Sequence, residues 1–309
     1  MDERGARAVR LFQDRYGPVR HGAGPTAVEE LLRAFAELPY ENLSKIVAWN
    51  RGRGPATPAS SLLPQAGWLR DPLTVVSDHL ALGTGGTCFS LTELLRALLE
   101  EAGLIAEPVM AHMRHGPNIH CALRVQLAGR SYLCDPGYLL DQPLALASCP
   151  PDGELAPGQP FLVRAGSLAG APGETLAGDF DLFTTDLDGS ARWRYRFSDR
   201  ATSREEFLGH WQRSFSLPAM RSLLATRRRG EELLYLHNHK LRRQGAGRTR
   251  TQNVRAELPG SLQRVFGIDP EISRRALELL RDEREAWRRA RPAREGRTTA
   301  RTVTPREPR

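Results

Sequence analysis

The segment Gly85-Gly86-Thr87-Cys88-Phe89-Ser90-Leu91 leads from two glycines into a predicted helix. Leucines follow at steps of three and four residues and would form one apolar helix face: Leu91, Leu94, Leu95, Leu98 and Leu99. Cys88 would then lie at a helix N-terminus, where unpaired N–H groups and the helix dipole favour negative charge and lower the pKa of a thiol. The glycines would let a substrate approach the backbone. The alternative is a cysteine that packs as a small hydrophobic side chain.

A thiolate nucleophile needs a base, and the base needs an acceptor that orients it. Residues 121–127 alternate in hydropathy and predict a strand, and Ala128-Gly129 predicts a tight turn into a return strand. In the register that this turn sets, His120 and Asp135 are diagonal neighbours on one face of the hairpin. A shift of one residue would place them on opposite faces. The other face would enter the core of a β-barrel and carries Cys121, Leu123 and Val125.

Each of these two polar residues also has an ordinary structural interpretation. His120 fits a histidine of any strand, and Asp135 fits a turn residue before a proline and a glycine. Their joint position downstream of Cys88 favours a Cys-His-Asp triad instead. In that triad Cys88 is the nucleophile, His120 is the base and Asp135 orients the imidazole.

The composition is that of a folded chain without a membrane span. The 309 residues suggest about two domains of ordinary size, and 40 % of them are hydrophobic, which is enough for a core. No stretch reaches the roughly 20 apolar residues that span a bilayer. Met1-Asp2-Glu3-Arg4 does not resemble a signal sequence, and four cysteines are too few for a disulfide scaffold. A cytoplasmic protein with reduced thiols is therefore expected.

The net charge of +8 does not indicate a nucleic-acid partner, because most of it lies at the C-terminus. Residues 288–309 contain 8 Arg and 2 Glu and carry +6, which leaves about +2 for the rest of the chain. The run Arg227-Arg228-Arg229 could meet the phosphates of a ligand. A solvated helix end or turn is the preferred interpretation of that run.

The first third of the chain predicts helices and the middle third predicts strands. Helices are expected over residues 6–16 and 27–38, the second after a capping box formed by Thr26 and Glu29, and residues 51–65 predict an exposed loop. Short strands separated by Gly and Pro indicate a small β-barrel or sandwich. These strands are expected at residues 131–134, 161–163, 180–183 and 193–197.

The last third mixes both types of element. A capping box of Ser203 and Glu206 predicts a helix over residues 203–211. Further helices are expected at residues 259–266 and 271–289, and strands at residues 233–239 and 249–255. The run after Arg291 has no apolar periodicity and predicts a disordered tail.

Three segments resemble motifs of the arylamine N-acetyltransferase family. Leu38-Pro39-Tyr40-Glu41-Asn42-Leu43 resembles its Pro-Phe-Glu-Asn-Leu segment, and Gly85-Gly86-Thr87-Cys88-Phe89 resembles its Arg-Gly-Gly-x-Cys-Phe/Leu-Glu motif. His120 and the later Tyr132-Leu133-Cys134-Asp135-Pro136-Gly137-Tyr138 resemble its His-strand-turn-Tyr-Leu-x-Asp-Val-Gly-Phe-Gly segment. The likeness extends in pieces over residues 6 to 270.

The resemblance implies an α+β fold with a cysteine-protease or transglutaminase-like catalytic core. Its parts would be an N-terminal helical bundle at 1–105 that carries Cys88, a central β-barrel at 106–200 that carries His120 and Asp135, and a C-terminal α/β lid at 201–290. The basic tail would follow at 291–309.

The resemblance also implies acetyl transfer in two steps, with acetyl-CoA as a consumed co-substrate and no metal. The Cys88 thiolate would take the acetyl group as a thioester, and an arylamine or hydrazine would then attack that thioester. The expected kinetics are ping-pong, with activity rising with pH as the nucleophilic pair ionises. Aromatic residues of the motifs would bind the substrate: Tyr40, Phe89 and Tyr138. The expected partners are a small amine and an acyl-CoA, with no membrane or nucleic acid. The sequence does not indicate the oligomeric state.

The chain departs from the family motifs at several positions. Thr84 stands where the motif has a basic residue, and Ser90 stands where it has an acid. Thr92 replaces an asparagine, and Pro136 replaces the valine after the aspartate. The triad residues are all present, so the nucleophilic chemistry is a firmer expectation than the arylamine acceptor.

Three other functions stay open on the sequence. A zinc site could use His112, His115, His120 and Cys121, although their spacing matches no closed structural site. A cysteine hydrolase, a transglutaminase-like enzyme or an amide synthase would use the same triad with another donor or acceptor. A binding protein with a decayed site is a third possibility.

Overall fold

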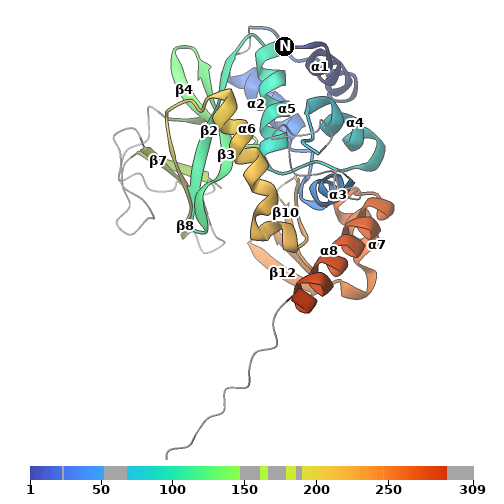
Figure 1. Cartoon of the computed structure of the whole chain (residues 1–309). Helices are drawn as coiled ribbons and strands as arrows, with labels where there is room; N and C mark the ends of the chain where they lie inside the picture. The colour runs from blue at the N-terminus through green and yellow to red at the C-terminus, as the bar shows by residue number, and fades with distance from the viewer. Residues whose placement is uncertain are drawn as a thin grey trace, which may run out of the picture.

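The computed structural model describes residues 1–22, 24–51, 68–146, 161–165, 179–185, 190–230, 232–245 and 247–290. Most of the loop expected at 51–65, the whole basic tail at 291–309 and Cys149 lie outside the described residues. The predicted α+β architecture is confirmed, with a helical layer beside a curved seven-stranded sheet and a second sheet below (Figure 1).

The helical layer is built around α5 (Cys88–Glu101). The predicted leucine face is confirmed: its five leucines are each 0 % exposed. They pack in one core with the apolar faces of α1 (Glu3–Tyr16), α2 (Pro25–Phe35) and α4 (Pro72–Leu82). Burying these side chains removes apolar surface from water and holds the start of α5 in place.

The seven-stranded sheet is antiparallel and runs in the order β5-β4-β3-β2-β8-β7-β6. Its two edge strands contact each other, so the sheet is nearly closed into a barrel. The strands are β2 (Ile105–Met113), β3 (Gly116–Leu127), β4 (Arg130–Cys134), β5 (Leu144–Ala145), β6 (Phe161–Ala165), β7 (Asp179–Thr185) and β8 (Ala191–Ser198).

The register of the β3–β4 hairpin is the predicted one, with Leu127 opposite Arg130. The expectation that Cys121, Leu123 and Val125 enter the barrel core is wrong. Leu123 and Val125 pack against the helical layer, and Cys121 packs in the core that contains Cys88. The helices cover the outer face of β3, so its larger apolar side chains point outward to them. The opposite face of β3, which carries His120, therefore points into the barrel.

The second sheet joins the N-terminal part of the chain to the C-terminal part. Its order is β1-β9-β10-β11-β12, and β1 pairs antiparallel with β9. The strands are β1 (Tyr40–Glu41), β9 (Leu224–Arg229), β10 (Glu232–His237), β11 (Lys240–Gly245) and β12 (Arg248–Asn253). The helices of this part are α3 (Leu43–Arg51), α6 (Arg204–Arg213), α7 (Leu258–Phe266) and α8 (Pro270–Ala290).

Three local predictions have different outcomes. Ser203 caps α6, because its side chain accepts from the N–H of Glu206. The capping box of Thr26 is wrong: α2 begins at Pro25, whose fixed φ suits the first helical position, so Thr26 is already inside the helix. The run Arg227-Arg228-Arg229 belongs to β9 and is not a helix end or turn.

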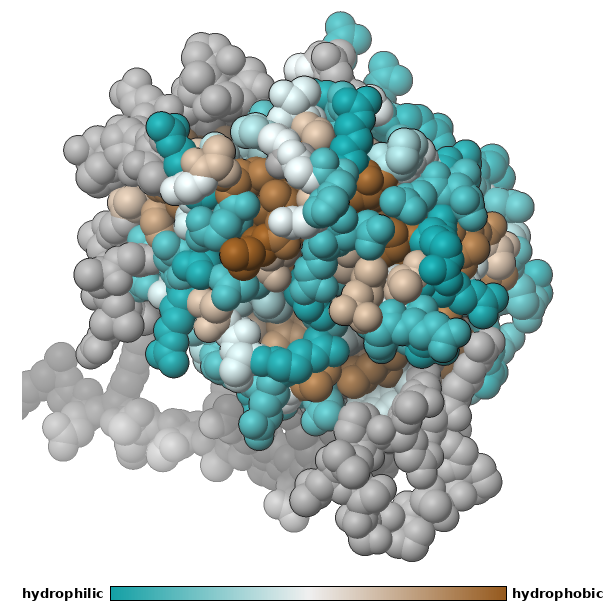
Figure 2. Space-filling model, turned by 90° about the horizontal axis from the view of Figure 1, so that it is seen from above, coloured by the Kyte–Doolittle hydropathy of each residue, from teal (hydrophilic) through white to brown (hydrophobic). Residues whose placement is uncertain are grey.

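No helix among the described residues is long and apolar enough to cross a membrane. On the face shown in Figure 2, hydrophobic residues form separate groups between hydrophilic ones. This surface has the mixed character of an ordinary folded domain.

Asn42 links β1 to the C-terminal part through its buried side chain. Its amide donates to the carbonyls of Ala219 and Ser222 at 2.9 and 2.7 Å and accepts from the N–H of Leu224 at 2.9 Å. Asn42→Ala leaves these backbone groups without partners, and we expect it to lower the free energy of unfolding by about 2–4 kcal/mol in urea denaturation. The control Gln252→Ala, at an exposed position of β12, should change it by about 0.5 kcal/mol or less. Equal effects of the two substitutions would contradict this role.

Candidate active site

Cys88 is the first residue of α5, directly after its N-cap Thr87. The cap residue makes no side-chain hydrogen bond to the helix, so Cys88 lies beside free helix N–H groups and the positive end of the dipole. The preceding glycines do not leave space for a substrate, contrary to the expectation. A Cβ at Gly85 would lie 1.8 Å from the Pro39 carbonyl oxygen. The glycines are instead required because the protein itself packs against the backbone there.

The segment before Cys88 is bonded to β1. Tyr40 and Gly86 form a parallel bridge, and the N–H of Glu41 donates to the Gly86 carbonyl at 2.9 Å. The N–H of Gly86 donates to the Pro39 carbonyl at 3.3 Å. Two of the segments that the sequence analysis singled out therefore lie side by side.

His120 and Asp135 meet inside the barrel. The His120 Nε2 atom lies 2.8 Å from Asp135 Oδ2, and both side chains are buried. The carboxylate also accepts from the Tyr195 hydroxyl at 2.5 Å and from the N–H groups of Gly137 and Tyr138 at 2.8 and 3.1 Å. These donors satisfy a carboxylate that is 0 % exposed and fix its orientation toward the imidazole.

The side chains of Cys88 and His120 are close enough to interact, and each shifts the pKa of the other. Since Nε2 of the imidazole faces Asp135, the Nδ1 atom is the one left for the sulfur. Burial lowers the pKa of His120, but the Asp135 carboxylate and the Cys88 sulfur outweigh burial and raise that pKa to about 10. The pKa of Cys88 lies well below its usual value, because hydrogen bonds from Cys121 and His120 and the charges of His120 and Lys45 outweigh burial. The arrangement favours a thiolate beside an imidazolium.

Gly137 occupies the point where these three side chains converge. A Cβ there would lie 2.7 Å from His120 Cε1, 3.2 Å from Asp135 Oδ1 and 3.2 Å from Cys88 Cβ. In the sequence, Gly137 is a turn residue and a position of the aspartate motif. The packing now gives it a separate reason to be glycine, because any side chain would displace the imidazole.

The aromatic residues expected to bind substrate have different surroundings. Tyr138 is half-buried and packs edge-on against the His120 ring, with 5.3 Å between ring centroids. Tyr40 is half-buried and close enough to Cys88 for their charges to interact. Phe89 is 1 % exposed and packs against Phe207 and Trp211, so its ring belongs to the hydrophobic core and faces no open surface.

Two groups near Cys88 were not expected from the sequence. Lys45 is buried, and its ammonium donates to the carbonyl and hydroxyl of Ser214 at 3.2 and 2.6 Å. Burial lowers the pKa of Lys45 to about 8, although the nearby Cys88 sulfur opposes this effect. The Cys121 sulfur lies 3.6 Å from Thr92 Oγ1, and burial followed by the Cys88 contact raises the pKa of its thiol. The sequence offered one indication of Lys45: it is one of two lysines in the chain, and the other is Lys240.

Solvent reaches little of this site. Cys88 is 5 % exposed and His120 is 4 % exposed. A cavity of about 520 Å³ between the ends of α4 and α7 is lined by residues such as Tyr16, His79 and Arg227, and by none of the three converging side chains. A substrate must therefore reach the sulfur through a small exposed area.

The residues considered for zinc do not form a metal site in the described part of the chain. No group of three or more His, Cys, Asp or Glu side chains there could hold a metal ion. His112 accepts a hydrogen bond from the N–H of Asn118 at 3.3 Å, and His120 is committed to Asp135.

We expect Gly137→Ala to slow the alkylation of Cys88 by iodoacetamide by about 10-fold or more, because the new methyl displaces His120 and weakens the ion pair that keeps the thiolate. Peptide mass spectrometry separates the label on Cys88 from label on the other cysteines. The control is Gly209→Ala in α6, where the nearest atom to a Cβ is 3.7 Å away. An alkylation rate of Gly137→Ala equal to that of the control would disprove this account of Gly137.

Known proteins share this sequence pattern and this fold. A sequence model of the N-acetyltransferase family matches residues 72–275. The arylamine N-acetyltransferase from Mycobacterium abscessus is 18 % identical, with a TM-score of 0.69 over 90 % of this chain and 96 % of that chain. The enzyme from Salmonella typhimurium is 18 % identical, with a TM-score of 0.64 over 89 % of this chain and 98 % of that chain.

A third solved structure is that of the Mycobacterium marinum arylamine N-acetyltransferase in complex with CoA. It is 18 % identical, with a TM-score of 0.64 over 88 % of this chain and 98 % of that chain. Comparison with curated protein sequences finds no match. At these identities the solved structures establish a common fold, and the family model covers most of the chain.

Proposed function

From the premise that this chain belongs to the arylamine N-acetyltransferase family and is an acetyltransferase, we propose that it transfers acetyl groups from acetyl-CoA through a thioester on Cys88. The acceptor we propose is a small arylamine or hydrazine. The single observation that carries the proposal is the buried His120–Asp135 pair beside a cysteine at a helix N-terminus. The CoA complex of the Mycobacterium marinum enzyme supports acetyl-CoA as the donor.

In the first proposed step the Cys88 thiolate attacks the thioester carbonyl of acetyl-CoA. The bond from the carbonyl carbon to the CoA sulfur breaks, and the CoA sulfur takes its electron pair and the proton of the His120 imidazolium. Asp135 stabilises the charged imidazole before this transfer and holds its orientation throughout. The products are CoA and an acetylated Cys88.

In the second proposed step the amine nitrogen attacks the acetylated Cys88. Neutral His120 accepts the proton that the amine loses, the bond to the Cys88 sulfur breaks, and the thiolate–imidazolium pair re-forms. The two half-reactions balance, so the enzyme needs no further reactant. Water in place of the amine would make the same site a thioesterase, and the acceptor experiment below separates the two reactions.

We expect acetyl-CoA alone to increase the intact mass of the protein by one acetyl group, with peptide mapping placing the group on Cys88. Adding an arylamine should remove the group and yield the acetylated amine. Cys88→Ala should show neither change, and Cys134→Ala, a buried cysteine outside the triad, should behave as the native protein. Acetyl transfer by Cys88→Ala would refute the thioester. Loss of the acetyl group at the same rate with and without amine would favour hydrolysis.

The rate of acetyl-Cys88 formation should depend on pH in two limbs. At acid pH the thiolate becomes protonated, and because the pKa of Cys88 is lowered, the rate should already be high at neutral pH. Above about pH 10 His120 loses the proton that the leaving CoA needs, so the rate should fall. The rate is measured by rapid quench and mass spectrometry.

Asp135→Asn tests the origin of the alkaline limb. The Asp135 carboxylate raises the pKa of His120, so this pKa falls in Asp135→Asn and the alkaline limb should move to lower pH. The maximal rate of acetyl-Cys88 formation should fall by about 100-fold or more. An unchanged alkaline limb in Asp135→Asn would show that His120 is not the group that titrates there.

A further inference from the structure

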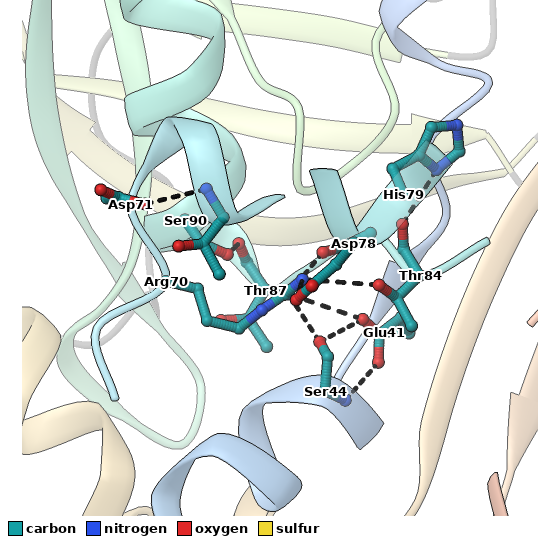
Figure 3. A network of polar contacts seen from close by, with 11 residues as sticks. Glu41, Ser44, Arg70, Asp71, Asp78, His79, Thr84, Thr87 and Ser90 are labelled. Carbon is teal, nitrogen blue, oxygen red and sulfur yellow. Dashed lines mark hydrogen bonds and ion pairs between the residues drawn. The ribbon is translucent and has the colours of Figure 1, made fainter. Parts of the chain in front are cut away.

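Arg70 places a guanidinium beside a position where the family motif has a basic residue and this chain does not. Thr84 stands at that position and is 0 % exposed. The Arg70 Nη2 atom lies 3.4 Å from Thr84 Oγ1, and Nη1 donates to the Gly85 carbonyl at 2.6 Å. The arginine comes from before α4 and reaches the turn that leads to Cys88 from another part of the chain (Figure 3).

A second departure from the motif lies close to Gly86, as does the same guanidinium. Ser90 stands where the motif has an acid, and its hydroxyl donates to the Thr87 carbonyl at 3.1 Å. A Cβ at Gly86 would lie 2.3 Å from Ser90 Oγ and 3.4 Å from Arg70 Nη1. The two altered motif positions therefore border the space that Arg70 fills.

The guanidinium is almost fully buried and meets one acid from β1 and one from α4. Arg70 is 4 % exposed and donates to Ser44 Oγ at 2.6 Å and to Asp78 Oδ2 at 3.0 Å. Its Nη1 atom lies 3.9 Å from Glu41 Oε1, and Glu41 also accepts from the N–H and hydroxyl of Ser44. A buried cation with this many partners is costly to replace by a neutral side chain.

We propose that Arg70 is a positioning residue that replaces the basic residue missing at Thr84 and holds the Gly85–Thr87 turn so that Cys88 begins α5 against His120. The Gly85 carbonyl is fixed by Arg70 on one side, and its Cα is pressed against Pro39 on the other. Cys88 follows three residues later, so a shift of this turn moves the sulfur directly. This inference rests on the proposed role of Cys88 as nucleophile.

The decisive experiment moves the charge back to the motif position. Arg70→Met should lower kcat by roughly 100-fold with little change in KM, since a small displacement of a reacting group has an effect of this order. It should also move the pH profile of Cys88 alkylation by iodoacetamide toward that of an ordinary thiol. The double variant Arg70→Met/Thr84→Arg should have a kcat at least about 10-fold higher than that of Arg70→Met. Its alkylation pH profile should move back toward that of the native protein.

Two controls separate positioning from stability. Arg70→Met/Thr84→Met has the same bulk at position 84 without the charge and should recover nothing. Arg196→Met removes another buried arginine, which pairs with Asp181 at 2.8 Å, and should lower the melting temperature while leaving the alkylation profile unchanged. The proposal is overturned if Arg70→Met keeps the native kcat and alkylation profile, or if methionine at position 84 rescues as well as arginine.

If Arg70→Met does not fold, Arg70→Lys tests the proposal instead. Lysine keeps the charge but lacks the planar fork that reaches Gly85, Ser44 and Asp78 together, so we expect about 10-fold slower alkylation at neutral pH. A native rate in Arg70→Lys would overturn the proposal. The alkylation comparison does not need acetyl transfer, so it still tests Arg70 if the native protein forms no acetylated Cys88.

Discussion

The hydrogen bonds of the Asp135 carboxylate are the constraint on which the arrangement of the site depends. The group has no exposed surface, so every oxygen lone pair that water would satisfy must find a donor in the protein. His120 on β3, Tyr195 on β8 and the backbone after β4 supply those donors. The barrel therefore has to bring three strands to one point, and that point lies beside the start of α5.

A second buried charge bonds to the turn that precedes Cys88. Arg70 and Glu41 connect the turn before α5 to β1, while the Asp135 group connects the barrel to the same helix end. Two buried polar networks from different layers of the fold therefore contact the segment that carries Cys88. Removing one member of such a network leaves its partners unsatisfied in a region of low polarity, which is why substitutions there are expected to act on both stability and reactivity.

The sequence predicted the parts of this fold that depend on local patterns. The Ala128-Gly129 turn was enough to predict the register of β3 with β4, and the leucine spacing was enough to predict the buried face of α5. Alternation along β3 distinguishes two faces but not which of them the helices cover, so the direction of Leu123 was predicted wrongly. The contacts of Arg70 and Lys45 join distant segments and have no periodic signal. β2 also gave no pattern, since it contains Pro108 and lacks regular alternation.

The charges around Cys88 respond to each other, and this has a consequence for the proposed cycle. The sulfur raises the pKa of both His120 and Lys45, since a thiolate beside a cation favours the protonated form. An acetylated Cys88 has no charge and no longer contributes that effect. The pKa of His120 is then lower than in the free enzyme, although Asp135 still supports the protonated form. A lower pKa keeps the imidazole neutral over a wider pH range after it has given its proton to CoA, and a neutral imidazole is the form that accepts the proton of the attacking amine.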